Sequence, residues 1–62
     1  MTTERIAMVG NERHFVSVYE VSKGVWIAIG KYKNESIRVQ GQTEDAALER
    51  WRAAATLRGP AQ

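Results

Sequence analysis

Apolar and polar positions follow two different periods along the chain, first that of a sheet and then that of a helix. Four segments rich in β-branched and aromatic residues predict strands at residues 5–9, 14–21, 25–32 and 36–40. The turn signals between them are Gly10-Asn11-Glu12, Ser22-Lys23-Gly24 and Lys33-Asn34-Glu35. Because such short connections join antiparallel neighbours, the pattern predicts a meander of three strands, or of four if residues 5–9 also pair.

The remaining residues predict one helix over residues 44–58. Thr43 suits the N-cap, and the acidic Glu44 and Asp45 suit the positive end of the helix dipole. Gly59 and Pro60 suit the termination of the helix. One apolar stripe runs along it and consists of Ala47, Leu48, Trp51, Ala54 and Ala55. We therefore expect a single α+β domain over residues 1–62, in which the C-terminal helix packs on one face of an antiparallel sheet.

Both faces of the predicted sheet are apolar, although a single helix can cover only one of them. We expect the helix to lie over Ala28 and Gly30, because small residues allow close approach. The aliphatic face left exposed would then carry Val16, Val18, Ile27 and Ile29. The opposite arrangement stays open and would expose an aromatic face suited to stacking bases, with Phe15, Tyr19, Trp26 and Tyr32. Either exposed face would be an interaction surface.

The size of the chain makes self-association the expected use of the aliphatic face. A domain of 62 residues buries only about 60% of its unfolded surface, so its own core is marginal. Disulfides, metals and oligomerisation are the usual remedies. Cysteine is absent and His14 is the only histidine, which leaves oligomerisation. We predict a homodimer in which Val16, Val18, Ile27 and Ile29 form the interface, acting as a small binding or regulatory module.

Catalysis and membrane insertion have no support in the sequence. No serine, histidine or acidic residue belongs to a catalytic motif, and His14 is expected to be an exposed strand residue. We therefore expect no enzymatic activity, cofactor or metal site. No apolar run approaches the ~20 residues of a membrane span. The start of the chain lacks the features of a secretory signal, so a cytoplasmic location in a bacterium or phage is expected.

Nucleic-acid binding is the alternative function. The formal net charge is only +2, so charge permits this function without arguing for it. A mixture of basic and aromatic side chains near the third turn is suited to contacting phosphate and stacking on bases. The residues concerned are Lys31, Tyr32, Lys33 and Arg38.

A family resemblance supports the same architecture. The residues that carry it are Trp26-Ile27-Ala28-Ile29, Ile37-Arg38-Val39 and Thr43-Glu44-Asp45-Ala46-Ala47, followed by Trp51 and Ala54-Ala55. Over roughly residues 14–56 this pattern resembles the three-stranded-sheet-plus-helix DNA-binding domains of the AP2 and integrase arm-binding type. The resemblance implies that Trp26 and Ala28 pack under the helix. It implies that the DNA-facing positions are Ile27, Ile29 and Lys31, with Val16 and Val18 beside them.

A second, looser analogy involves the segment Gly41-Gln42-Thr43-Glu44-Asp45-Ala46, which looks like the strand-to-helix step of HicB-type antitoxin domains. Those domains are also modules of a sheet and a helix. Both analogies therefore agree with the predicted fold class.

Overall fold

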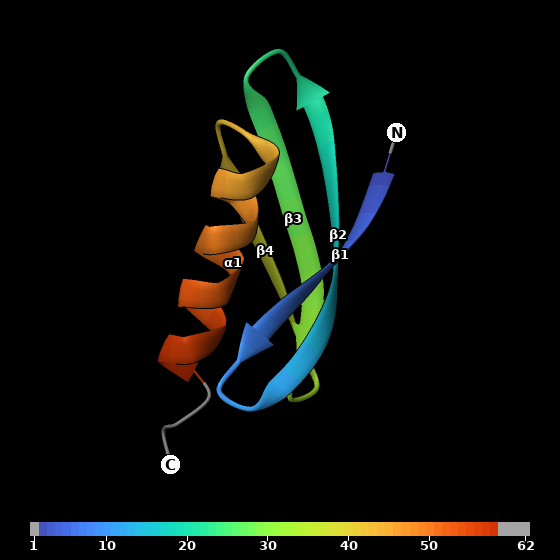
Figure 1. Cartoon of the computed structure of the whole chain (residues 1–62). Helices are drawn as coiled ribbons and strands as arrows, with labels where there is room; N and C mark the ends of the chain where they lie inside the picture. Colours follow the sequence, from blue (N-terminus) through green and yellow to red (C-terminus); the bar gives the residue numbers. More distant parts are fainter. Residues whose placement is uncertain (1, 59–62) are drawn as a thin grey trace.

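A four-stranded antiparallel sheet is followed by one helix in the computed structural model, which describes residues 2–58 (Figure 1). The elements are β1 (Thr2–Val9), β2 (Glu12–Ser22), β3 (Val25–Tyr32), β4 (Glu35–Gly41) and α1 (Glu44–Arg58). The predicted α+β class, the antiparallel meander and the bounds of β3 and α1 are confirmed. The other three strands are longer than predicted, and β1 is fully paired with β2 from Thr2 onward.

Tight turns join the strands in the order β1-β2-β3-β4. The β3–β4 turn consists of Lys33 and Asn34, whose φ angles of 51° and 67° are those of a type I′ turn. Gly10 and Gly24 supply positive φ in the other two turns. Each strand therefore pairs with its neighbour in sequence.

The start of α1 has the predicted cap. The backbone N–H of Ala46 donates to the hydroxyl oxygen of Thr43 at 3.0 Å, and the N–H of Ala47 donates to the Thr43 carbonyl at 3.0 Å. Acidic residues in the first turn complement the helix dipole. The predicted termination at Gly59 and Pro60 lies outside the described residues.

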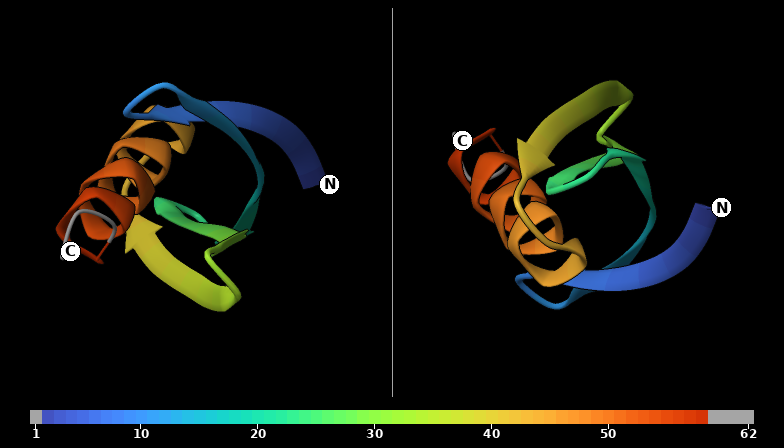
Figure 2. Two further views of the ribbon diagram at one scale, coloured as in Figure 1. Left: turned by 90° about the horizontal axis from the view of Figure 1, so that it is seen from below. Right: turned by 90° about the horizontal axis from the view of Figure 1, so that it is seen from above.

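The sheet curves around α1, so that β1 and β4 approach the helix from either side (Figure 2). Trp51 lies at the centre of the core, is completely buried, and donates from its indole N–H to the Ile37 carbonyl at 3.1 Å. The predicted helix stripe faces the sheet: Ala47, Leu48 and Ala55 are buried, and Ala54 is partly buried. The helix therefore lies over Ala28 and Gly30, as expected.

Two glycines allow this close approach. A Cβ on Gly30 would lie 3.1 Å from the Trp51 ring and 2.9 Å from the Phe15 carbonyl oxygen. A Cβ on Gly41 would lie 2.5 Å from the backbone nitrogen of Ala47. Both positions are thus restricted to glycine by space, because the neighbouring atoms belong largely to backbone or to the central tryptophan.

A β-bulge in β2 decides which residues lie beneath the helix. Ser22 pairs with Val25, but Glu20 pairs with Trp26, so Val21 is an extra residue on its strand. Without the bulge, Glu20 would pair with Ile27 instead of Trp26. Each β2 residue that precedes Val21 would then share a face with β3 residues that now lie on the opposite face. The bulge therefore reverses the faces of β2 relative to β3.

The prediction that Val16, Val18, Ile27 and Ile29 share one exposed face is wrong for this reason. Val16 pairs with Gly30 and Val18 with Ala28, so both valines lie under α1 and have no exposed surface. Ile27 and Ile29 lie on the opposite face of the sheet. The regular hairpin that the turn signal suggests would have grouped all four residues.

Candidate functional site

The face of the sheet turned away from α1, called here the outer face, carries the candidate site. Its residues follow from the strand register, in which directly opposite residues share a face. Ile6 is opposite Phe15, Met8 opposite Arg13, and Ile29 opposite Arg38. In residues 2–58 no second helix or strand covers this face.

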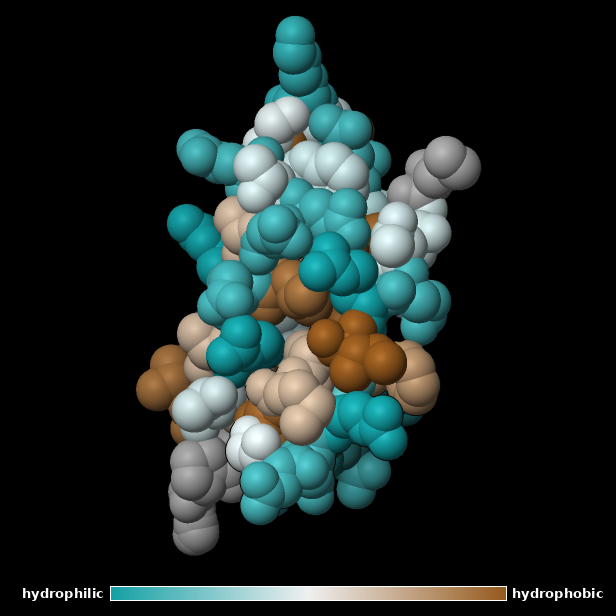
Figure 3. Space-filling model, viewed as in Figure 1, coloured by the Kyte–Doolittle hydropathy of each residue, from teal (hydrophilic) through white to brown (hydrophobic). Residues whose placement is uncertain are grey.

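An exposed apolar patch lies at the β1–β2 side of the outer face. Phe15 is 71% exposed, and Ile6 and Met8 are each 49% exposed. In the space-filling view, hydrophobic side chains gather where the second half of β1 passes in front of the sheet (Figure 3). Contiguous exposed apolar side chains often mark interaction surfaces, so this patch of one aromatic and two apolar residues is a candidate site.

Charges are divided unevenly between the two sides of the molecule. The outer face has three exposed cations but only one of the chain's seven carboxylates, Glu4, which accepts a hydrogen bond from Ser17 at 3.1 Å. The three cations are Arg13, Lys31 and Arg38. Within residues 2–58 none of the three forms an ion pair. The outer face is therefore an unneutralised basic surface next to an exposed aromatic ring.

The helix side differs because two of the three arginines of α1 are paired with carboxylates. Arg58 lies 3.0 Å from Glu35, and Arg52 lies 2.8 Å from Glu49. Arg50 donates instead to the carbonyl oxygen of Gln40 at 3.2 Å. The net charge of the whole sequence is small, but the paired charges lie on the helix side and the cations of the outer face form no ion pair within residues 2–58. The alternation of signs along the sequence does not indicate this separation.

Arg5 joins the sheet to the start of the helix on that same side. Its guanidinium lies 2.7 Å from the Glu44 carboxylate and 3.4 Å from that of Asp45. The hydrogen bond to Glu44 raises the pKa of Arg5 above its ordinary value, against an opposing effect of burial, and Asp45 raises it further. The Arg5 guanidinium is therefore fully charged and hydrogen-bonded to the carboxylates of Glu44 and Asp45.

The proposed dimer residues contribute little to the outer face. Val16 and Val18 lie under the helix, and Ile27 is only 2% exposed although it faces outward. Tyr19 and Gln40 lie opposite Ile27 on the two neighbouring strands. Of the four predicted residues, Ile29 alone is both on the outer face and partly exposed.

The predicted nucleic-acid residues are divided between the two sides. Lys31 and Arg38 are exposed on the outer face, whereas Tyr32 is 6% exposed and packs in the core beneath α1. The ammonium of Lys33 lies 5.7 Å from the Tyr32 ring centroid. Tyr32 is therefore not available for stacking on a base. Sequence reasoning missed Arg13, because the predicted strand began at His14 and left Arg13 in the turn.

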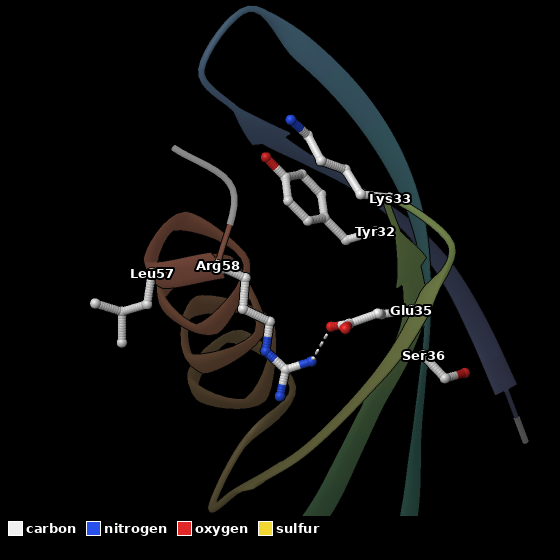
Figure 4. A pocket seen from close by; sticks show the side chains of 6 residues that line it. All are labelled: Tyr32, Lys33, Glu35, Ser36, Leu57 and Arg58. Atoms are coloured by element: carbon white, nitrogen blue, oxygen red, sulfur yellow. Dashed lines mark hydrogen bonds and ion pairs between the residues drawn. The ribbon is translucent and has the colours of Figure 1, made fainter. Parts of the chain in front are cut away.

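Tyr32 and Lys33 instead line a shallow hollow of about 730 Å³ between the β3–β4 turn and the end of α1. Figure 4 shows the Glu35–Arg58 ion pair crossing it, with the side chains of Ser36 and Leu57 directed away. The single carboxylate of the hollow is thus paired with a guanidinium.

His14 is also placed differently from the prediction that it is an exposed strand residue. Its ring packs 4.8 Å from that of Tyr32 and 6.0 Å from that of Trp51, measured between centroids. Its Nε2 is buried and lies 3.3 Å from a Glu12 carboxylate oxygen. The bulge again explains the difference, because it turns the even-numbered residues of β2 toward the helix.

Within residues 2–58, no three histidine, cysteine or acidic side chains are grouped as a metal site would require. The same residues form no helix with the length and apolar character needed to cross a membrane. The outer face, with its basic and aromatic residues, is the chemically distinctive surface of the described chain.

Comparison with known proteins adds no assignment to this geometry: no family model matches the chain, and neither the curated proteins nor the solved structures include a significant match.

Proposed function

We propose that this protein is a small nucleic-acid-binding module that uses the outer face of its sheet. The observation that carries the proposal is a set of three cations, Arg13, Lys31 and Arg38, that form no ion pair within residues 2–58 and share the outer face with the exposed ring of Phe15. Guanidinium and ammonium groups contact phosphate, and an exposed aromatic ring stacks on bases. An ordinary solvated sheet face explains the charges but leaves the exposed phenylalanine without a reason.

The family resemblance supports the same face. Trp26 and Ala28 lie on the helix side, and Ile27, Ile29 and Lys31 lie on the outer side, as the AP2-type resemblance implies. The bulge replaces Val16 and Val18 on that outer side with Phe15 and Ser17. Compared with the sequence expectation, the exposed surface is therefore more aromatic and less aliphatic.

Electrostatics also favours a polyanion over a second copy of the chain. Face-to-face sheets lie about 10 Å apart, where each pair of like charges costs about 0.4 kcal/mol in water and about 1.7 kcal/mol at an effective dielectric constant of 20. Each copy would bring three cations and one carboxylate to the interface. The exposed apolar side chains of the outer face, Ile6, Met8 and Phe15, offer on the order of 300 Å², against about 800 Å² per partner in a standard interface.

Salt-dependent binding tests the proposal. The protein is titrated into labelled single-stranded and duplex oligonucleotides at several salt concentrations. With up to three phosphate contacts, the slope of log K against log[salt] should be about −2 for a single strand and about −2.7 for a duplex. The variant with Arg13→Gln, Lys31→Gln and Arg38→Gln should bind weakly, with a slope near zero.

A matched variant separates the outer face from net charge alone. Arg50→Gln, Arg52→Gln and Arg58→Gln remove the same number of charges from the helix side. We expect this control to keep nearly the parent affinity and slope. Equal weakening of both triple variants would contradict the proposal, as would an absence of binding by the parent at low salt.

Self-association is the second candidate, and the half-exposed Ile6 and Met8 beside Phe15 favour it. In this case the interface moves from the residues first predicted to the apolar patch at β1 and β2. Sedimentation equilibrium of the parent and of an Ile6→Lys variant tests it: a dimeric parent and a monomeric, folded variant are the expected results. A monomeric parent would exclude this candidate.

A further inference from the structure

We infer that the outer face binds single strands in preference to duplexes, with an unpaired base stacked on Phe15. This inference rests on the nucleic-acid function proposed above and names the form of its ligand. The neighbours of Phe15 are apolar: Ile6 lies directly opposite on β1, and Met8 lies one step further along that strand on the same face. Phe15 and its two apolar neighbours form a surface that matches the flat, weakly polar face of a base.

The faces of bases are available only in unpaired strands. A duplex presents mainly phosphates, sugars and the polar edges of its bases, with the thymine methyl as its one apolar group, and it keeps the flat faces of its bases stacked. Burying Phe15, Ile6 and Met8 against a duplex backbone would desolvate phosphates without compensation. Stacking on an extruded base removes the same apolar surface from water without this cost.

The width of the surface leads to the same conclusion. The apolar patch begins on β1 and the cations continue to Arg38 on β4, so the surface extends over all four strands. At about 4.8 Å between neighbouring strands it measures about 14 Å along the sheet. The major groove of B-form DNA is about 12 Å wide and admits an α-helix or a two-stranded ribbon. A flexible single strand has no such limit and can follow the curvature of the face.

The arrangement also suggests how long a strand is contacted. A path from Ile6 on β1 through Phe15 on β2 to Arg38 on β4 covers about 14 Å. Even at the rise of about 3.4 Å in a fully stacked B-form strand, this path holds at most about four to five nucleotides, and a more extended strand would cover it with fewer. Affinity should therefore rise with oligonucleotide length up to about five nucleotides and change little beyond that.

The experiment compares labelled oligothymidylate and oligouridylate of about 3 to 12 nucleotides, and at the longest length a duplex of equal length, at one salt concentration. We expect the parent to bind the single strands at least about tenfold more tightly than the duplex. Phe15→Leu, which keeps an apolar side chain but removes the ring, should weaken single-strand binding roughly five- to 150-fold. Phe15→Trp should retain or increase the affinity.

Controls separate the failure of this inference from that of the proposed function. Leu57→Ala removes a side chain that is 82% exposed on α1, and this variant should bind as the parent does. Circular dichroism of Phe15→Leu should match that of the parent, because the ring is mostly exposed. Duplex binding equal to or tighter than single-strand binding, or full affinity in Phe15→Leu, would overturn the inference and leave nucleic-acid binding intact. If the parent binds neither form, both proposals fail.

Discussion

The two faces of the sheet differ in the side chains they carry and in how their charges are paired. The helix side contains small residues, a central tryptophan and several ion pairs. The outer side contains an exposed ring and three cations that form no ion pair within residues 2–58. Both faces belong to the same four strands, so the contrast arises from the strand register, which decides which side chains point toward α1. The register thereby separates the part of the sequence needed for folding from the part available for binding.

The largest expected effect distinguishes the two faces by removing one aromatic residue from each. Trp51→Ala should lower the free energy of unfolding by about 3–5 kcal/mol, because it leaves a cavity and an unpaired carbonyl at Ile37. Phe15→Ala should cost less than about 1 kcal/mol, the range of a cross-strand pair. Chemical denaturation of both variants measures the difference. Similar losses in the two would show that the outer ring also supports the fold.

A smaller effect is expected where the helix approaches the sheet most closely. Gly41→Ala should destabilise the fold by about 1–3 kcal/mol or more, because its Cβ would overlap backbone atoms of Ala46 and Ala47. Gly10→Ala is the matched control: its Cβ meets nothing within 4 Å, so only its φ of 62° opposes the change. The melting temperature of Gly41→Ala should be well below that of Gly10→Ala. The reverse order would contradict the close packing at Gly41.

The turn at the far end of β3 offers a stabilising change. Lys33 adopts φ of 51°, which is unfavourable for a residue with a long side chain, and type I′ turns prefer Asn-Gly. Lys33→Asn combined with Asn34→Gly should raise stability by about 0.5–1 kcal/mol. Lys23→Asn removes the same charge from a turn position without positive φ, and its melting temperature should stay unchanged. No gain in the double variant would mean that the Lys33 contact with Tyr32 offsets the relief of strain.

The smallest effect concerns the paired charges of the helix side. A group whose pKa is raised by folding contributes stability that is complete below its unfolded pKa and disappears only as the pH rises through the higher folded value. Arg5 therefore contributes equally at pH ~7 and pH ~10. The difference in melting temperature between the parent and Arg5→Gln should be constant over this range. For Arg5→Lys the difference should grow near pH ~10, where an ammonium begins to lose its proton.

The helix was predictable because local signals define it. Thr43, the acidic first turn and the spacing of Leu48 and Trp51 act within one or two turns, and the structure reproduces all of them. The strand order was predictable for a similar reason, since each short turn leaves only one neighbour available. The polar residues Thr2 and Thr3 gave no strand signal, because their pairing is determined by β2 rather than by their own pattern.

The candidate site was less predictable, because it depends on the register of β2 against β3. One extra residue, Val21, exchanged Val18 for Ser17 and Val16 for Phe15 on the outer face. No short-range pattern in the sequence distinguishes a bulged hairpin from a regular one of nearly the same length. Arg13 was missed for a related reason: its membership of β2 follows from pairing with Met8 on β1.

The bulge has a consequence for how this chain tolerates length changes. Val21 has no direct partner on β3 and is 52% exposed. A gene lacking its codon would therefore encode a straighter strand in which Glu20 and the residues before it keep their partners on β3. Losing one codon between Phe15 and Tyr19 would instead move the side chains on one side of the deleted position to the opposite face of the sheet. Insertions and deletions in related genes should therefore concentrate at Val21 and spare the rest of β2. In such genes, a one-residue gap at this position would be a sign of shared architecture rather than of divergence.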